Sequence, residues 1–225
     1  MPALQHFVWC DLEFTDADVR RAHIMQAAIM ITTSELEPIQ PEGGEPGDGL
    51  SVIARLTPEQ AATASPWVRE HQAELLQRCL TDEAALPISE ADSLFAAYVH
   101  ARCDVPTQAT DDPAERETLR EGNPLLSGNS VHKDHALIIE HMPRLADALS
   151  FRLIDVSTLK ELARRWATVP KLDKTDRAAM QAVLSPLGIS LSEAGKHDAL
   201  YDVKCSIAEL AHYRDRWLRP PRAPS

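Results

Sequence analysis

The sequence predicts an α/β fold in which helices flank a mixed sheet. Three observations support this prediction. Strand-like segments come first, helical and strand-like patterns then alternate, and the 225 residues, 44% of them hydrophobic, suit one domain of this class. Strands followed by an alternation of helix and strand are typical of a mixed sheet with helices packed against it.

Three segments near the start of the chain are predicted strands. Residues 6–14 (HFVWCDLEF), 27–33 (AAIMITT) and 50–56 (LSVIARL) are rich in strand-forming side chains. Between the last two, residues 37–49 are rich in Pro, Gly and Glu, so they should form a loop. We expect these strands to form a meander that opens the sheet.

The next segments are predicted helices. In residues 57–80 and 88–103, apolar side chains recur at helical spacing, and Thr57 and Ser89 are suitable N-cap residues. Residues 105–122 read as a polar connector.

Strand-like and helical patterns alternate after this connector. The predicted elements are a short buried strand at 124–130, a helix at 133–142, a strand at 151–157 and a helix at 158–166. Thr158 and Glu161 have the spacing of a capping box at the start of the last of these helices. With the meander, these segments give five strands in one mixed sheet.

Two further helices are predicted near the C-terminus. One lies within 173–188 and should end at Gly188, and the other is a long amphipathic helix for which Asp198 is the expected N-cap. We expect a single domain over residues 1–218, inserted loops near 38–49, 104–122 and 167–196, and a disordered tail at 219–225.

Composition narrows the class of protein. The first residues lack a basic and apolar leader pattern, and nowhere do about 18 apolar residues follow one another, so we expect a soluble cytoplasmic protein. The four cysteines lack C-x-x-C spacing, which indicates buried free thiols. A net charge of −11 argues against a protein that coats long nucleic acid, but it is compatible with a small anionic substrate held by bound metal.

Two acids lie in the first predicted strand. Asp11 and Glu13 are two residues apart, so a strand places both carboxylates on one face. Burying two adjacent acids is costly unless a cation compensates them, and oxygen ligands without thiolates favour Mg²⁺ or Mn²⁺. The alternative is a solvated strand end.

Three more candidates lie at the starts of two helices. Asp134 falls in a first helical turn, where the helix dipole alone also favours an acid. Asp202 borders the apolar face of the last helix, and His197 precedes that helix. Five residues of helix turn by about 500°, so His197 can meet Asp202 only by swinging in from the loop, as a general base would. A structural or solvated histidine is the alternative.

The order Asp-x-Glu, Asp and His-x4-Asp resembles the DEDDh exonucleases of the ribonuclease H-like fold. Within that group, the segments FVWCDLEFT, NPLLSGNSVHKD, RLIDVSTLKELARRW and HDALYDVKCSIAELAHYR resemble the oligoribonuclease family. The resemblance covers most of residues 5–16, 123–166 and 197–217, and the middle of the chain matches chiefly through WVREH. It implies a ribonuclease H-like mixed five-stranded sheet flanked by helices, and removal of 5′-mononucleotides from the 3′ ends of very short RNAs, ending with dinucleotides.

The resemblance also implies a reaction. Asp11, Glu13, Asp134 and Asp202 would hold two divalent ions, Mg²⁺ or Mn²⁺, about 4 Å apart, one activating a water and the other stabilising the departing 3′ oxygen. His197 would take the proton of the attacking water. The partners would be short single-stranded RNA or dinucleotides, together with a second copy of the chain in a homodimer, and no membrane.

Substrate contacts follow from the same resemblance. It assigns base stacking to Trp67, with His71 nearby, and a 5′-phosphate site to Ser130, Arg152 and Ser157. The alternatives are a tryptophan docked on the core and an arginine in a surface salt bridge.

The chain departs from the family at three places. Ala17 stands where the family has a leucine that wedges the bases, and Ser150 and Phe151 replace a His-Tyr pair that the family supplies across its dimer. The replacement at Ser150 and Phe151 removes an imidazole and a phenolic hydroxyl that would reach phosphate, although Arg152 can still bind it bidentately. The segment 167–196 is longer than the family's usual connection.

Three other functions stay open. A haloacid-type phosphatase would use the similar D-x-D-x-T motif, but its second acid should be Asp instead of Glu13, and it needs no His197. A catalytically silent descendant would only bind nucleotides or a partner protein. A broader exonuclease would act on longer single-stranded RNA or DNA.

Overall fold

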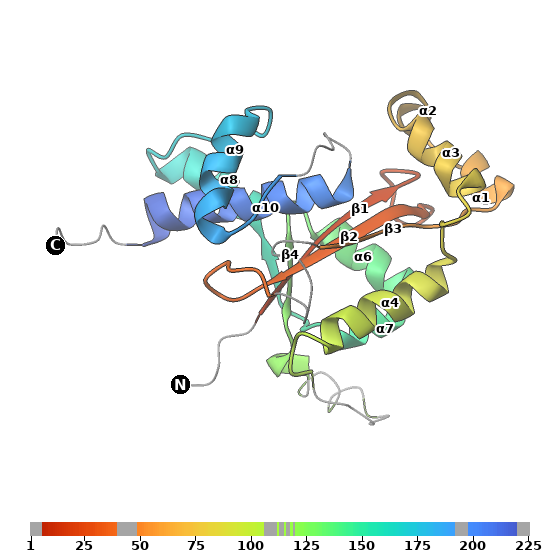
Figure 1. Ribbon diagram of the computed structural model, residues 1–225, viewed down its shortest axis with the longest axis horizontal. Coiled ribbons are helices and arrows are strands. Elements are labelled where there is room, and N and C mark those ends of the chain that lie inside the picture. Colours follow the sequence, from red (N-terminus) through yellow and green to blue (C-terminus); the bar gives the residue numbers. More distant parts are fainter. Residues whose placement is uncertain are drawn as a thin grey trace.

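One mixed sheet of five strands forms the centre of the protein (Figure 1). The computed structural model describes residues 6–39, 49–105, 112, 115, 118, 120–191 and 198–219. The strands are β1 (Phe7–Phe14), β2 (Ile24–Thr32), β3 (Leu50–Ile53), β4 (Leu125–Gly128) and β5 (Leu153–Asp155), in the order β3-β2-β1-β4-β5. The first three strands pair antiparallel, whereas β4 pairs parallel with β1 and with β5. The predicted mixed sheet is confirmed.

Helices cover both faces of this sheet (Figure 1). They are α1 (Pro58–Ala62), α2 (Pro66–His71), α3 (Ala73–Thr81), α4 (Ile88–His100), α6 (His132–His141), α7 (Pro143–Ala148), α8 (Val156–Trp166), α9 (Arg177–Leu184) and α10 (Ala199–Tyr213). α10 packs on β1 and β2 with α8 and α9 beside it, and α4, α6 and α7 pack on the opposite face. α1, α2 and α3 form a smaller cluster around Met25.

The side chains of β1 alternate between these two cores. Val8, Cys10 and Leu12 are buried in the core with α4, α6 and α7, whereas Trp9 is buried in the core with α10. Successive side chains of a strand point to opposite faces, so Asp11 and Glu13 project on the α10 side. The alternation of side chains along β1 therefore determines that Asp11 and Glu13 face α10.

The predicted helix at 57–80 is divided into three. Thr57 begins α1 with the predicted cap, here a capping box with Gln60. Ser65 caps α2, whose first residue is Pro66. Proline has no backbone N–H and is disfavoured inside a helix, so the chain stops and starts again at this point.

Two predicted caps are wrong. α4 begins directly after Pro87, so Ser89 lies inside its first turn. α8 begins where β5 ends, with the Asp155 side chain as its cap, so Thr158 and Glu161 do not form a capping box. Pro87 and Asp155 therefore occupy the N-cap positions that were predicted for Ser89 and Thr158.

The caps predicted near the C-terminus are confirmed. The Asp198 side chain accepts a hydrogen bond from the Tyr201 N–H and begins α10. α9 is shorter than the predicted 173–188 helix because Asp176 caps it, and the turn that follows ends at Gly188 with φ 74°. This left-handed conformation carries little penalty for glycine.

Several predictions fall on residues that the structure does not describe. They concern most of the 38–49 loop, most of the 104–122 connector, His197 and all but the first residue of the tail. Within the described part of the chain, no helix is both long and apolar enough to cross a membrane. The four cysteines are free and buried, as predicted.

Candidate active site

Three elements bring the predicted acids together. Asp11 and Glu13 lie on β1, Asp134 lies in the first turn of α6, and Asp202 lies in the first turn of α10. One carboxylate oxygen from each of Asp11, Glu13 and Asp202 can be chosen so that all three lie within 4.8 Å of one another. Residues from both ends of the sequence therefore meet in one potential cation site.

Asp134 is fixed against the same strand from the opposite side of the sheet. Its Oδ1 accepts a hydrogen bond from the Leu12 N–H at 2.9 Å, and the residue is 6% exposed. Leu12 lies between the two acids of β1, so this bond places a further carboxylate beside them. A role as a dipole acid alone does not explain a side chain that reaches across to another element.

Burial and mutual repulsion perturb these acids. Burial, followed by the charges of Asp134, Asp202 and Glu13, holds the pKa of Asp11 well above its usual range. Burial also raises the pKa of Glu13 and of Asp134, in each case to about 7. Each shift means that the protein without a cation disfavours the ionised carboxylate.

The donor set fits a hard divalent cation. The clustered ligand atoms are carboxylate oxygens, and the nearby Cys10 is buried in the core on the other face of β1. Oxygen ligands of this kind suit Mg²⁺ and Mn²⁺. A bound cation would also offset the repulsion that raises the pKa of the Asp11 carboxyl.

His197 lies outside the described residues, but its neighbour is fixed. The carboxylate of Asp198 accepts a hydrogen bond from the Gln26 side chain of β2 at 3.2 Å, and the Gln26 amide oxygen accepts from the Ala199 N–H at 3.3 Å. The residue after the predicted base is thereby attached to the sheet beside Glu13, which is also on the β1–β2 ladder.

An exposed aromatic pair stands on α2. Trp67 is 48% exposed, and its ring stacks on His71 with centroids 4.8 Å apart and planes inclined by 11°. The alternative of a tryptophan docked on the core is therefore wrong. Ala17, at the position of the family's leucine, is an exposed residue after β1.

Gln72 links this pair to the acids, a role that the sequence did not suggest. It follows His71 directly, is 5% exposed, and its amide nitrogen donates a short hydrogen bond to a carboxylate oxygen of Glu13. The same α2 segment therefore presents an aromatic surface to solvent and an amide to a candidate metal ligand.

Two of the three predicted phosphate ligands lie together. The hydroxyl oxygens of Ser130 and Ser157 are 3.2 Å apart, and the backbone N–H of Ser130 donates to Asp155 Oδ1 at 2.9 Å. Ser130 has φ 53°, a conformation that non-glycine residues adopt rarely and that is often retained at functional sites.

Arg152, the third predicted ligand, has a different partner. Its guanidinium lies 2.5 Å from a carboxylate oxygen of Glu121 and 4.7 Å from the centre of the Phe151 ring. The surface salt bridge considered as an alternative is therefore present. Phe151 is 41% exposed, whereas Ser150 is fully buried.

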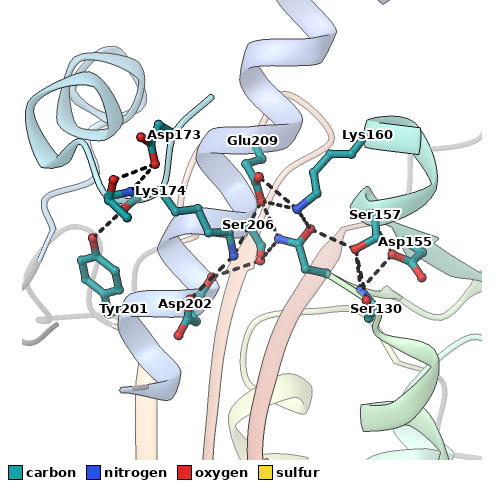
Figure 2. A network of polar contacts seen from close by, with 12 residues as sticks. Ser130, Asp155, Ser157, Lys160, Asp173, Lys174, Tyr201, Asp202, Ser206 and Glu209 are labelled. Carbon is teal, nitrogen blue, oxygen red and sulfur yellow. Dashed lines mark hydrogen bonds and ion pairs between the residues drawn. The ribbon is translucent and has the colours of Figure 1, made fainter. Parts of the chain in front are cut away.

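A buried polar network behind the site was also missed by sequence reasoning (Figure 2). Glu209 of α10 is 0% exposed, and its carboxylate accepts hydrogen bonds from Lys160 at 3.1 Å and from Asn129 at 2.7 Å. Lys174 approaches the same carboxylate and also Asp202. A fully buried acid inside an amphipathic helix is the signal that points to such partners.

Comparison with known proteins identifies relatives over nearly the whole chain. The chain is 33% identical to oligoribonuclease of Pseudomonas aeruginosa over 218 residues, covering 96% of this chain and 97% of that protein. It is 32% identical to oligoribonuclease of Corynebacterium diphtheriae, covering 96% and 85% of the two chains. A probable oligoribonuclease of Schizosaccharomyces pombe is 30% identical, covering 95% and 69%. No protein-family model matches the chain.

Solved structures support the fold. Exonuclease I from Methylocaldum szegediense aligns with a TM-score of 0.57 at 19% identity, over 96% of this chain and 41% of that one. Pop2p of S. pombe, in its Mg²⁺- and Mn²⁺-bound form, aligns with a TM-score of 0.59 at 11% identity, over 94% and 84%. The ribonuclease H-like arrangement expected from the motifs is confirmed, and the extent and identity of the sequence matches show that the chain belongs to the oligoribonuclease family.

Proposed function

We propose that this protein is a metal-dependent 3′→5′ exoribonuclease that hydrolyses short oligoribonucleotides, down to dinucleotides, to nucleoside 5′-monophosphates. The observation that carries the proposal is that Asp11, Glu13 and Asp202 meet in one cluster although they come from two distant segments of the sequence. Asp134 is held beside this cluster by its hydrogen bond to the N–H of Leu12, the residue between Asp11 and Glu13. Family membership adds the substrate class. It also removes the support for a phosphatase, whose nucleophile mechanism leaves Glu13 and Asp134 without a role.

The acids have one shared task in this proposal. Asp11, Glu13, Asp134 and Asp202 hold two divalent ions, Mg²⁺ or Mn²⁺. When bound, the ions supply Lewis acidity for the attack of water on the phosphodiester and positive charge for the departing 3′ oxygen. The Leu12 N–H and the Gln72 amide keep two of these carboxylates in position before any ion arrives.

His197 takes the proton from the attacking water. An imidazole suits this step because its ordinary pKa lies near neutral pH. The anchoring of Asp198 to β2 supports the assignment, since Asp198 is the next residue in the sequence and its charge acts on Glu13.

Substrate binding uses the surfaces on either side of the acids. The exposed Trp67 stacks on a base, with His71 behind it. The hydroxyls of Ser130 and Ser157 bind the 5′-phosphate, and Arg152 joins them after it leaves Glu121. The protein works in the cytoplasm as one domain over residues 1–218, paired in a homodimer through the region of Phe151.

A second candidate is a broader exonuclease on single-stranded RNA or DNA. It is favoured by the engagement of Arg152 with Glu121 and by the small side chain of Ala17, both of which weaken a site built for one short substrate.

Digestion of 5′-labelled RNAs of different lengths tests the proposal. RNAs of two, three, five and seven nucleotides and matching DNAs are incubated with Mg²⁺, Mn²⁺ or EDTA. We expect metal-dependent cleavage in which the dinucleotide is cut faster than the heptamer. Asp202→Asn is the control for contaminating nuclease, and Asp215→Asn, at an exposed position in the turn of residues 214–218 that follows α10, is the matched control that should stay active.

The other outcomes separate the alternatives. Similar rates at all lengths and on DNA would indicate the broader exonuclease. Absence of metal-dependent cleavage from every substrate would indicate a silent binding protein and contradict the proposal.

A further inference from the structure

Lys174 places a cation beside a candidate metal ligand. Its Nζ lies 3.6 Å from Asp202 Oδ1 and 3.7 Å from Glu209 Oε2, and its side chain is 24% exposed. It reaches α10 from the segment between α8 and α9 (Figure 2). This segment lies within residues 167–196, for which the sequence predicts an inserted loop.

The backbone around Lys174 is held in place. The Tyr201 hydroxyl donates to the carbonyl oxygen of Lys174 at 3.3 Å, and Leu172 is buried in the core with α10. The Asp173 carboxylate accepts from the backbone N–H of Thr175 at 2.8 Å, which closes a turn around the lysine. The approach of Lys174 to Asp202 is therefore built into the fold, in contrast to an ordinary surface lysine.

Glu209 offers the same ammonium group a second position. Asp202 and Glu209 are seven residues apart on α10, which is about two helical turns, so they lie on one face. Glu209 already has Lys160 at 3.1 Å, and the Asn129 amide donates to it. Lys174 can thus leave Asp202 and stay near a carboxylate.

A divalent ion bound to Asp202 must share that carboxylate with the lysine. Two cations this close repel each other, most strongly in a partly buried site. We propose that Lys174 is the counter-ion of Asp202 in the metal-free protein, that it withdraws toward Glu209 when a metal ion binds, and that it thereby sets the metal affinity of the site. The inference rests on the proposed function, because it requires Asp202 to be a metal ligand.

Metal binding without RNA provides the test. The full chain is stripped with EDTA, dialysed and titrated with Mn²⁺ alone by isothermal titration calorimetry. Lys174→Met is compared with Lys171→Met, which removes an exposed lysine from the same segment and changes the net charge equally. We expect Lys174→Met to bind Mn²⁺ roughly tenfold more tightly than Lys171→Met, because only Lys174 lies beside the ion.

Thermal unfolding supplies a second readout. In EDTA, Lys174→Met should melt below Lys171→Met because Asp202 has lost its counter-ion, and in saturating Mn²⁺ the difference should vanish. If Lys174→Met does not fold, Lys174→Gln, which keeps a polar end without the charge, takes its place in both measurements.

Two outcomes would overturn the inference while leaving the proposed function intact. They are equal Mn²⁺ affinity of the two variants and weaker binding by Lys174→Met. Equal affinity together with a higher KM for the dinucleotide would make Lys174 a substrate contact instead. Failure of the unmodified chain to bind Mn²⁺ at all would instead contradict the proposed function, and the inference with it.

Discussion

The acids of the site differ in how each charge is compensated. Asp134 accepts a backbone N–H, Glu13 accepts the Gln72 amide, and Asp202 has the Lys174 ammonium at 3.6 Å. Asp11 lies among the other three carboxylates, which together with burial raise its pKa. The metal-free site therefore keeps an excess of negative charge around β1, and this excess should be visible in the stability of the protein.

The free energy of unfolding without metal should fall as the pH rises from 5 to 8. Glu13 and Asp134 have pKa values of about 7 in the folded protein and ordinary values near 4 when unfolded. Between these values the folded state binds more protons, so raising the pH favours unfolding until the pH passes about 7. Urea unfolding in EDTA at several pH values measures this slope.

Glu13→Gln provides the comparison for that slope. In Glu13→Gln the free energy of unfolding should fall less steeply with pH than in the unmodified chain. Glu74→Gln, at an exposed position on α3, should leave the slope unchanged. Saturating Mg²⁺ should flatten the slope of the unmodified chain. An identical fall in Glu13→Gln would show that this carboxyl is not the group that titrates.

Loss of the Gln72 amide should weaken the metal site. In Gln72→Leu, one oxygen of Glu13 loses its donor, and groups that orient metal ligands typically contribute about 10- to 100-fold to metal affinity or activity. Mn²⁺ titration and kcat at saturating metal should both report the loss. Gln77→Leu, on the exposed side of α3, is the matched control, and a Gln72→Leu protein indistinguishable from it would contradict the orienting role.

At the scale of elements, α2 would connect substrate recognition to the acids of the site in the proposed function. One short helix carries Trp67 and His71, and the residue that ends it donates to Glu13. The proposed base-stacking residue and the residue that orients a proposed metal ligand are therefore only five positions apart in the chain.

Trp67→Ala should weaken binding of the dinucleotide with little change in melting temperature. Stacking of a base on an aromatic side chain contributes about 1–3 kcal/mol, and the ring is 48% exposed, so few core contacts are lost. KM and the thermal midpoint are the measurements. Trp166→Ala, at a tryptophan 73% exposed on α8, should change neither, and equal effects of the two variants would remove Trp67 from the site.

The sequence predicted the strands and helices that carry the acids better than it predicted the residues that contact those acids. The period of two along β1 placed Asp11 and Glu13 together, and the position of Asp134 and Asp202 in first turns was confirmed. Gln72 could not be found in this way, since it lies 59 residues from Glu13 and no local pattern joins them. The same holds for Lys174, whose contact depends on how the segment before α9 folds over α10.

Helix starts were harder to predict than helices. Thr57 and Asp198 are N-caps as predicted, because no competing cap residue lies just before them. In α4 and α8, by contrast, Pro87 and Asp155 occupy the N-cap position in place of the predicted Ser89 and Thr158. The choice among neighbouring caps depends on where the preceding strand or loop ends, which is decided by tertiary structure.

At the scale of the whole molecule, the charge of the chain conflicts with that of its substrate. A net charge of −11 repels RNA, and the acids of the site add to that repulsion locally. Bound metal ions would make the local charge positive at the position where the phosphate must lie.

Removal of metal should therefore abolish RNA binding as well as cleavage. His197→Ala keeps the four carboxylates but should turn over slowly, so binding of a fluorescent dinucleotide can be followed by anisotropy. We expect binding in Mn²⁺ and its loss in EDTA, with recovery when Mn²⁺ is restored. Tight binding in EDTA would mean that side-chain cations alone hold the phosphate.

The placement of Cys10 makes it a chemical probe of local opening at the central strand. Cys10 directly precedes Asp11, points into the opposite core, and is 2% exposed. Burial, with the charges of Asp134 and Asp11, holds the pKa of its thiol well above the usual range. An alkylating reagent can reach this sulfur only when the strand or the helices that cover it move apart, so the rate of labelling at Cys10 reports local opening around the strand that carries the acids, without a probe among the acids themselves.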